Sequence, residues 1–119
     1  MIYAFVLIDR PDAAALRQQV RPAHKAYIAA VAERIAFAGP LLHDDGATAL
    51  GSLLAIDFDD RAGAEAWLAA EPFTCAGVYA SAAVHAFDNL WPQKAGFPPG
   101  ASGPGPHVPL RADATPPAG

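Results

Sequence analysis

The chain carries runs of hydrophobic residues whose spacing predicts four strands. Residues 2–8, IYAFVLI, are apolar on both faces, which is typical of a strand that is buried on both sides of a sheet. Residues 52–58 alternate between two faces and predict another strand, and residues 81–91 form the last one. The stretch IAFAGPLLHDDG predicts an edge strand followed by a turn, because Pro40 cannot donate to a ladder.

A helical stripe follows the first strand. Its members recur every three or four positions, as one face of a helix requires: Leu16, Val20, His24, Tyr27, Val31 and Ile35. Pro22 clashes with the preceding turn inside a helix, but it fits the first position of a new one. We therefore expect a short helical piece near residues 12–20 with Asp12 as its N-cap, a break at Arg21, and a main helix over residues 22–34.

A second helix is expected over residues 61–70. Asp59 or Asp60 provides its N-cap, and Pro72 sets its end, because the residue before a proline is driven toward extended geometry. The segment FTCAGVY then connects this helix to the last strand. The element order β-α-β-β-α-β matches the α+β ferredoxin-like fold, an antiparallel sheet with two helices on one face. In its usual strand order, 4-1-3-2, the second strand lies at an edge, which suits Pro40 independently.

Two helices can cover only one face of a four-stranded sheet, although the first and last strands are apolar on both. In the last strand, Val84 and Ala86 fall on one face, and Ala83, Phe87 and Trp91 fall on the other. An apolar sheet face needs a cover, and a second copy stacking sheet on sheet in a twofold homodimer is the favoured source. The alternative cover is the C-terminal tail folding back.

Composition narrows the function classes. The 119 residues predict one domain, and 53% hydrophobic residues suit a small globular protein with a real core. A net charge of −4 with scattered basic residues lacks the footprint of nucleic-acid binding. The apolar N-terminus is too short to span a membrane and has no signal-peptide features, so we expect no membrane contact. The single Cys75 excludes an internal disulfide, and a reducing cytoplasm fits best.

Composition also divides the chain. Residues 92–119 hold eight of the twelve prolines and five of the ten glycines, and they show no hydrophobic period. This change predicts a folded domain over residues 1–91, followed by an irregular tail that is either disordered or draped over a partner subunit.

Five short motifs occur in order along the folded part. They are Arg21-x-x-His24, Gly39-Pro40-Leu41, Gly51-Ser52-Leu53, Glu71-Pro72-Phe73 and Ala76-Gly77-Val78-Tyr79. With these motifs the chain resembles the YciI-like family of small proteins. The resemblance implies a ferredoxin-like domain in a dimeric α+β barrel and a pocket built around a histidine and an acidic residue. A few members of that family act as dehydrochlorinases or share their fold with lactone isomerases, and most have no established reaction.

His24 and Glu71 are the candidate catalytic residues. If Pro22 starts a helix, His24 lies in its first turn, where the helix dipole and burial both favour the neutral imidazole that a general base needs. Glu71 stands where the family usually has aspartate and is expected at the C-terminal end of the second helix. There it would donate a proton or orient the His24 ring. The structural alternatives are a core histidine with satisfied nitrogens and a solvent-exposed helix-end acid.

Four more residues are candidates for substrate binding. Arg21 could clamp a substrate carboxylate through two hydrogen bonds, or it could cap a structural carboxylate. Ser52 starts a central strand and could hydrogen-bond a ligand, with nothing to make it a nucleophile. Phe73 and Tyr79 could wall the pocket, although aromatic residues in such positions are more often plain core.

No motif predicts a metal site or a cofactor. His43, Asp44 and Asp45 look like a ligand cluster, but Asp-Asp-Gly is turn chemistry first, and no spacing brings His85 to them. His43 also stands where the family often has an acidic residue. The sequence has no nucleotide-binding loop, and no base adjoins Cys75 to activate its thiol. We therefore expect neither a cofactor nor a bound metal.

The favoured interpretation is a small cofactor-independent enzyme of the lyase or isomerase type that transfers a proton on a small anionic or phenolic metabolite. His24 would move the proton, Glu71 would orient or complement it, and Arg21 would position the anion. Two alternatives stay open. One is a non-catalytic dimer that binds a metabolite or holds the pair as polar core, and the other is an accessory module whose proline-rich tail docks a partner.

Overall fold

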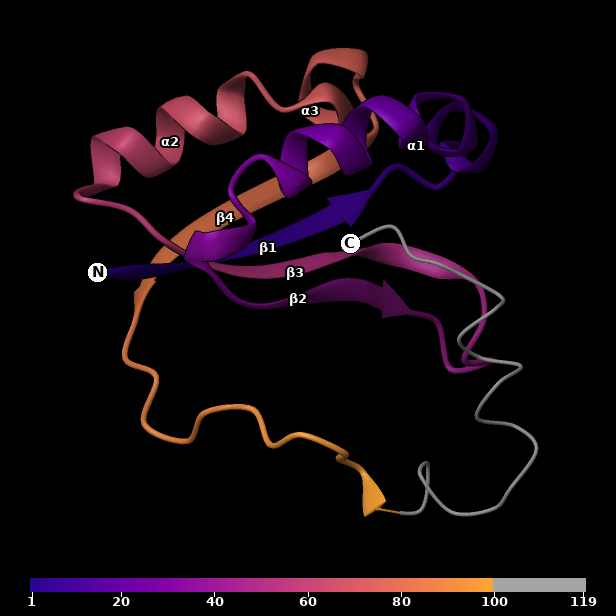
Figure 1. Cartoon of the computed structure of the whole chain (residues 1–119). Coiled ribbons are helices and arrows are strands. Elements are labelled where there is room, and N and C mark those ends of the chain that lie inside the picture. The colour runs from indigo at the N-terminus through magenta and orange to yellow at the C-terminus, as the bar shows by residue number, and fades with distance from the viewer. Residues whose placement is uncertain (100–119) are drawn as a thin grey trace.

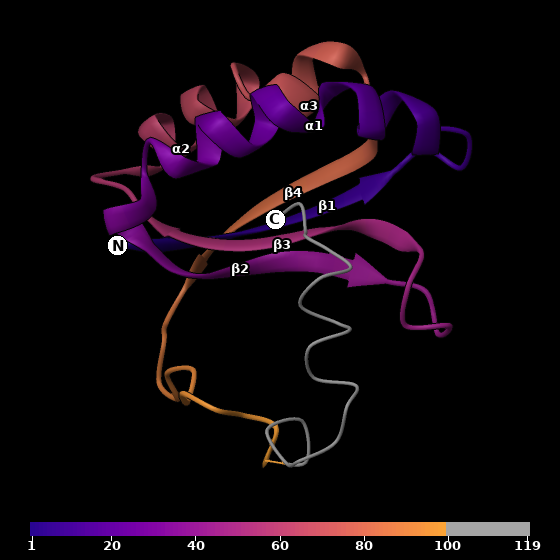
Figure 2. The same cartoon turned by 45° about the vertical axis from the view of Figure 1, so that its right-hand side comes forward.

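The computed structural model describes residues 1–99 as two layers, with a four-stranded sheet on one side and all the helices on the other (Figures 1 and 2). The strands are β1 (Ile2–Asp9), β2 (Ile35–Leu42), β3 (Ala49–Asp57) and β4 (Tyr79–Phe87). The helices are α1 (Ala14–Ala29), α2 (Arg61–Ala69) and the short α3 (Pro72–Ala76), with a 3₁₀ turn, η1, over Ala32–Arg34. This order confirms the ferredoxin-like α+β fold.

The sheet is antiparallel, with the strand order β2-β3-β1-β4. β2 therefore lies at an edge, as Pro40 indicated. In the centre, β1 pairs with β3 so that Gly51 lies opposite Ile8. A Cβ atom built on Gly51 would meet the carbonyl oxygen of Leu7 at 1.9 Å, so any side chain there would push the two central strands apart.

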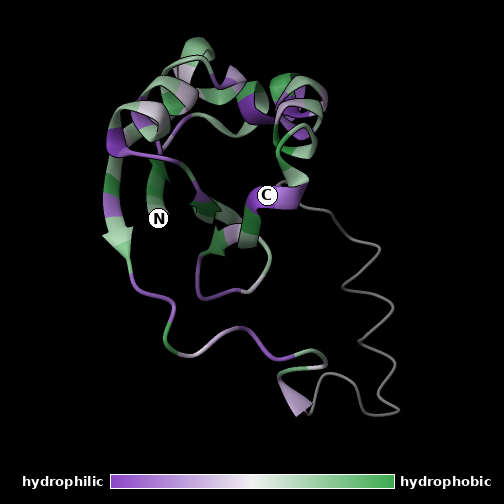
Figure 3. Cartoon of the chain, turned by 60° about the vertical axis from the view of Figure 1, so that its left-hand side comes forward, coloured by the Kyte–Doolittle hydropathy of each residue, from purple (hydrophilic) through white to green (hydrophobic). Residues whose placement is uncertain are grey.

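Two hydrophobic clusters fill the space between the sheet and the helices. The larger consists of Tyr3, Phe5, Leu7, Leu54, Ile56, Phe58, Ala64 and Val84. Its β1 members belong to a strand that is hydrophobic along its length (Figure 3). The smaller cluster consists of Ala13, Phe73 and Val78, with Leu16 and Val20 of α1 packed against it. This second cluster joins α1 to α3, and the candidate site lies beside it.

α1 is one continuous helix with Pro22 inside it, so the predicted break at Arg21 is wrong. Residues on both sides of the proline pack inward on the same stripe, Val20 against the smaller cluster and Ile28 against the larger. That shared burial outweighs the roughly 3 kcal/mol that a proline costs inside a helix. Pro22 is exposed, so water can reach the carbonyl group that it leaves without a donor. His24 consequently lies well inside the helix and not in its first turn.

The predicted helix starts were right in one case and wrong in another. The side chain of Asp60 caps α2 by accepting a hydrogen bond from the N–H of Gly63 at 2.8 Å, as expected. Asp12 does not cap α1, because the helix begins at Ala14, one residue later than expected, and its N-cap is the buried Ala13, which makes no side-chain cap bond. α1 also ends at Ala29 rather than at residue 34, and η1 follows it.

The segment between α2 and β4 is more regular than the predicted connector. Pro72 occupies the first position of α3 and so begins a helix as well as ending the previous one. Gly77 closes α3 with a φ of 81°, a conformation that glycine adopts readily. β4 then covers Tyr79–Phe87 rather than residues 81–91.

The face of the sheet opposite the helices is mostly apolar. The strand register places on it Ile2, Ala4, Val6, Ile8, Phe37, Leu53, Ala55, Ala83 and Phe87, a set that we call the open face, together with the polar residues Asp57, Ser81 and His85. Residues 88–99 lie on this side of the sheet in both views, and Trp91 is 91% exposed (Figures 1 and 2). Most of the predicted tail, residues 100–119, falls outside the described residues. Along residues 1–99, none of the helices has the length and apolar character needed to cross a membrane.

Candidate active site

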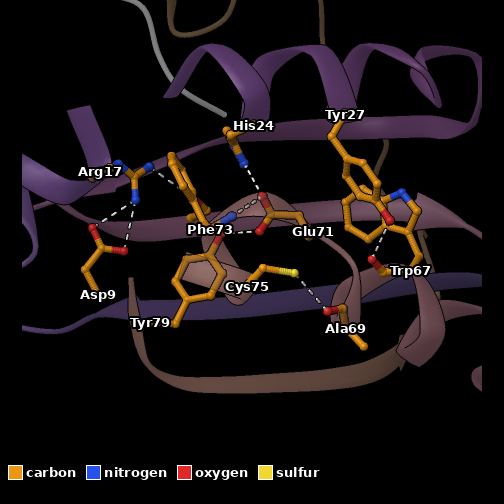
Figure 4. A network of polar contacts seen from close by, with 11 residues as sticks. Asp9, Arg17, His24, Tyr27, Trp67, Ala69, Glu71, Phe73, Cys75 and Tyr79 are labelled. Carbon is orange, nitrogen blue, oxygen red and sulfur yellow. Dashed lines mark hydrogen bonds and ion pairs between the residues drawn. The ribbon is translucent and has the colours of Figure 1, made fainter. Parts of the chain in front are cut away.

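His24 of α1 and Glu71, which lies between α2 and α3, meet in the protein interior. Nδ1 of His24 lies 2.6 Å from Oε2 of Glu71, and both side chains are fully buried (Figure 4). The two residues are 47 positions apart in the sequence, so the contact is made by the fold. Glu71 is therefore not the solvent-exposed acid of the alternative interpretation.

The Glu71 carboxylate accepts three hydrogen bonds. Besides His24, the backbone N–H of Phe73 donates to Oε2 at 2.9 Å, and the Tyr79 hydroxyl donates to Oε1 at 3.0 Å. Glu71 directly follows the C-cap of α2, as expected, and it is also the N-cap of α3, which the sequence did not predict. The N-cap position supplies one of the three donors, and together they give both oxygens of a buried carboxylate a partner.

The contact with Glu71 fixes which nitrogen of His24 donates. A carboxylate can only accept, so Nδ1 carries the proton of this contact, and the tautomer that can act as a base has its lone pair on Nε2. The expected effect of a helix N-terminus on His24 does not apply, since the residue lies well inside α1. The pair is arranged so that Nε2 can accept a proton while the carboxylate stabilises the imidazolium that results.

Tyr79 supports the carboxylate and does not simply wall a pocket. Burial, followed by the negative charge of Glu71, raises the pKa of Tyr79 far above its ordinary value. The side chain therefore remains a phenol that can donate to Glu71. Its ring meets the Phe73 ring edge-on, with centroids 6.0 Å apart. Phe73 itself is fully buried and stacks on the imidazole of His24.

Two charged residues that sequence reasoning missed lie next to this group. Arg17 of α1 is 6% exposed, and its Nη1 donates to both carboxylate oxygens of Asp9 at 2.9 Å. Its Nη2 donates to the hydroxyl of the buried Ser52 at 3.2 Å. The signal was present in the sequence, because Arg17 lies about two helical turns before His24, and Asp9 ends an apolar strand. A charge beside an apolar stripe and next to a buried acid predicts an internal ion pair.

Arg21 lies outside the buried group. It lines a shallow depression of about 380 Å³ on the outer flank of α1 together with Gln18, Pro22 and Lys25. Neither His24 nor Glu71 lines this depression. The structure thus brings the predicted pair together with Phe73 and Tyr79, and it places Ser52 on Arg17 and Arg21 on the adjoining surface.

The His43-Asp44-Asp45 segment forms a turn. Asp45 accepts hydrogen bonds from the N–H groups of Ala47 and Thr48 and from the Thr48 hydroxyl. These bonds lower the pKa of Asp45 to about 2. Within residues 1–99, no three side chains of the histidine, cysteine and acidic types are grouped so as to hold a metal ion.

Known proteins resemble this chain over the same region. The profile of the YCII-related domain matches residues 1–88. Protein YciI of Escherichia coli O6:H1 is 33% identical over 98 residues, covering 76% of this chain and all of the relative. Protein YciI of Shigella flexneri matches to the same extent.

A solved structure shares the fold. It is the 5-chloro-2-hydroxyhydroquinone dehydrochlorinase TftG from Burkholderia phenoliruptrix AC1100, in complex with 2,5-dihydroxybenzoquinone. The two superimpose with a TM-score of 0.69 at 27% identity, over 74% of this chain and 94% of the other. The match confirms the fold that the five sequence motifs implied.

Proposed function

Because the chain belongs to the YCII-related domain family, we propose that it is a small enzyme of the lyase or isomerase type that needs no cofactor. His24 acts as the general base on a small phenolic or anionic metabolite, and Glu71 orients it. The observation that carries this proposal is the fully buried contact of 2.6 Å between Nδ1 of His24 and Oε2 of Glu71.

The chemistry follows from the tautomer. Nε2 of His24 takes a proton from a phenolic O–H or an activated C–H group, and the growing charge on the imidazole is stabilised by Glu71. In an elimination, the electron pair released by that bond forms the new double bond. The leaving group departs as an anion with the electrons of its own bond to carbon. The imidazolium then returns its proton to water.

The substrate class is suggested by the structural neighbour. That enzyme is a dehydrochlorinase of a hydroxylated hydroquinone and was solved with a dihydroxybenzoquinone. Both molecules carry acidic hydroxyl groups of the kind that a neutral imidazole can deprotonate. A phenolic compound of this class is therefore the first substrate to test on this chain.

Arg21 positions the anionic form of the substrate. It lies three residues before His24 on α1 and lines a depression on the outer flank of this helix. A guanidinium binds a phenolate or carboxylate through parallel hydrogen bonds. Phe73 stacks on His24 and Tyr79 donates to Glu71, so these two residues support the pair. Ser52 is bound by Arg17.

The protein acts as a homodimer that pairs through the open face. This surface is continuous across the four strands, and its Phe37 and Phe87 rings are in contact at 6.0 Å. Phe87 is 36% exposed in the single chain. Apolar surface of this extent is rare on a monomer, and a second copy supplies a matching face of the same shape.

The proposed reaction is tested with a panel of hydroquinones and hydroxyquinones, with and without a chlorine substituent. Each is incubated with the wild-type protein, with Glu71→Gln and with the control His43→Gln, which alters an exposed turn residue. We expect the wild type and the control to accelerate loss of at least one compound over buffer, and Glu71→Gln to be slower. Equal rates in Glu71→Gln and wild type would remove Glu71 from the mechanism.

One observation favours a second candidate function, a non-catalytic dimer with the pair as polar core. Both His24 and Glu71 are fully buried and lie outside the depression that Arg21 lines. In that case no compound of the panel is converted. Binding, if any, then leaves the NMR signals of the His24 ring unchanged.

A further inference from the structure

The Phe73 ring lies between two side chains of the same helix. The imidazole of His24 stacks on it with centroids 3.8 Å apart and an interplanar angle of 10°. The guanidinium carbon of Arg17 lies 4.7 Å from the centroid of the same ring. Because His24 covers one face, Arg17 must take the other, and Figure 4 shows the ring between them.

The helix geometry makes this arrangement possible. Arg17 and His24 are seven residues apart, which is two turns of α1 and a rise of about 10.5 Å. Both therefore point from the same side of the helix, with room for one flat ring between them. Phe73 reaches into that space from α3, the helix that Glu71 caps.

Arg17 is anchored to the sheet and not to the helix layer. Nη1 is bound by both oxygens of Asp9 at the end of β1, and Nη2 donates to Ser52 of β3. The side chains of Arg17 and Asp9 are only 8% and 9% exposed. Burial raises the pKa of Asp9, while the charge of Arg17 opposes that rise. Because β1 and β3 both hold the Arg17 guanidinium, it stays in place and limits the movement of the Phe73 ring that it covers.

His24 needs more than its hydrogen bond to have a defined orientation. The contact between Nδ1 and Glu71 fixes the position of one ring atom and leaves the tilt of the ring to its packing. The plane of the ring is set by stacking on Phe73. The plane of Phe73 is set in turn by the edge of Tyr79 and by the guanidinium on its far face.

We infer that Arg17 is a positioning residue for His24. Asp9 and Ser52 hold its guanidinium against Phe73, and Phe73 holds the imidazole in the plane in which Nε2 meets the substrate. This inference rests on the proposed role of His24 as the base. It assigns to the Asp9–Arg17–Ser52 cluster a role in the reaction, although the cluster contacts neither His24 nor Glu71 directly.

The variants that test it retain the fold. Arg17→Lys keeps the charge and the ion pair with Asp9 but loses the flat guanidinium that covers the ring. Asp9→Asn keeps the size of the side chain and weakens the hold on Arg17 without removing it. Arg10→Lys is the matched control. Arg10 is half-exposed, and its ion pair with the exposed Asp12 is long, at 4.0 Å.

The primary measurement is NMR of the histidine rings in the protein without substrate. Protons of a ring stacked on Phe73 are shifted upfield by its ring current, and the His24 signals are identified by their loss in His24→Gln. We expect a downfield shift of these signals in Arg17→Lys, a smaller shift in the same direction in Asp9→Asn, and none in Arg10→Lys. Wild-type positions in both Arg17→Lys and Asp9→Asn would overturn the inference.

A second readout separates this inference from the proposed reaction. If a substrate is found, Arg17→Lys should lower kcat between about tenfold and a hundredfold while KM changes little, because a misplaced base slows the chemistry rather than binding. An unchanged kcat with shifted His24 signals would overturn the role in the reaction. If no compound is converted, the NMR result alone still decides whether Arg17 orients His24.

Discussion

Nδ1 of His24 is held 2.6 Å from Oε2 of Glu71 by elements from opposite halves of the chain, the long helix α1 and the cap of the short helix α3. The cap geometry gives Glu71 its first donor from Phe73, and the start of β4 gives it a second from Tyr79. His24 is the third. The carboxylate is thus fixed on three sides before any substrate arrives, which is the arrangement that orienting a base requires.

Removal of this carboxylate should strongly destabilise the fold. Glu71→Ala leaves buried donors of His24, Phe73 and Tyr79 without an acceptor, and we expect a loss of about 3–5 kcal/mol in the free energy of unfolding by urea. The control is Glu65→Ala, which removes an exposed ion pair with Arg61 and should cost less than about 0.5 kcal/mol. Similar losses in the two variants would contradict the account of the buried carboxylate.

Tyr79 should make the protein sensitive to alkaline pH. Its folded-state pKa is raised by burial and by Glu71, so above pH 10 the unfolded chain loses a proton that the folded protein keeps. For this one group, stability should fall by about 1.4 kcal/mol per pH unit above pH 10. Thermal unfolding from pH 8 to 11 measures the slope.

Tyr79→Phe tests the assignment of that slope. It removes the hydroxyl and should flatten the curve above pH 10, at the cost of about 1 kcal/mol near neutral pH for the lost bond to Glu71. Parallel curves for the variant and the wild type would show that another group causes the alkaline loss.

The two glycines in the sheet motifs should differ sharply in their tolerance of a side chain. Gly51→Ala places a methyl group against the backbone of Leu7, and we expect a loss of about 3 kcal/mol or failure to fold. At Gly39, an added Cβ meets no atom within 4 Å, so Gly39→Ala should stay within about 1 kcal/mol of wild type. Equal urea midpoints for the two variants would contradict the close approach of β1 and β3.

The proposed homodimer predicts the effect of a charge on the open face. Val6→Lys puts an ammonium in the middle of β1 on this face and should halve the mass measured by light scattering. Ala62→Lys, at an exposed position of α2, should leave the mass unchanged. A wild-type mass equal to that of one chain would instead contradict the proposed homodimer.

Much of the fold could be predicted from the sequence, because strand patterns and turn residues are local signals. The edge position of Pro40 and the cap at Asp60 follow from the chemistry of single residues. The break at Arg21 was wrong for the opposite reason. Local proline chemistry favours it, but burial of Val20 and Ile28 against different clusters keeps the helix continuous.

The candidate site could be predicted only in part. The motifs pointed to His24 and Glu71, yet the donors around Glu71 depend on α3, a helix of five residues too short for a periodic signal. Arg17 was missed because it lies beside the apolar stripe, next to Leu16, and is not one of its members. Its partner Asp9 comes from a different element, and only the packing of α1 on the sheet brings the two together.

The central claim is tested most directly by the turnover number of His24→Gln on the best substrate of the hydroquinone panel. Glutamine fills a similar space and its amide can still donate to Glu71, so the fold should persist while the proton acceptor is lost. We expect kcat to fall at least about a hundredfold, with His43→Gln at the wild-type rate. An unchanged turnover number in His24→Gln would contradict the claim that this histidine is the base.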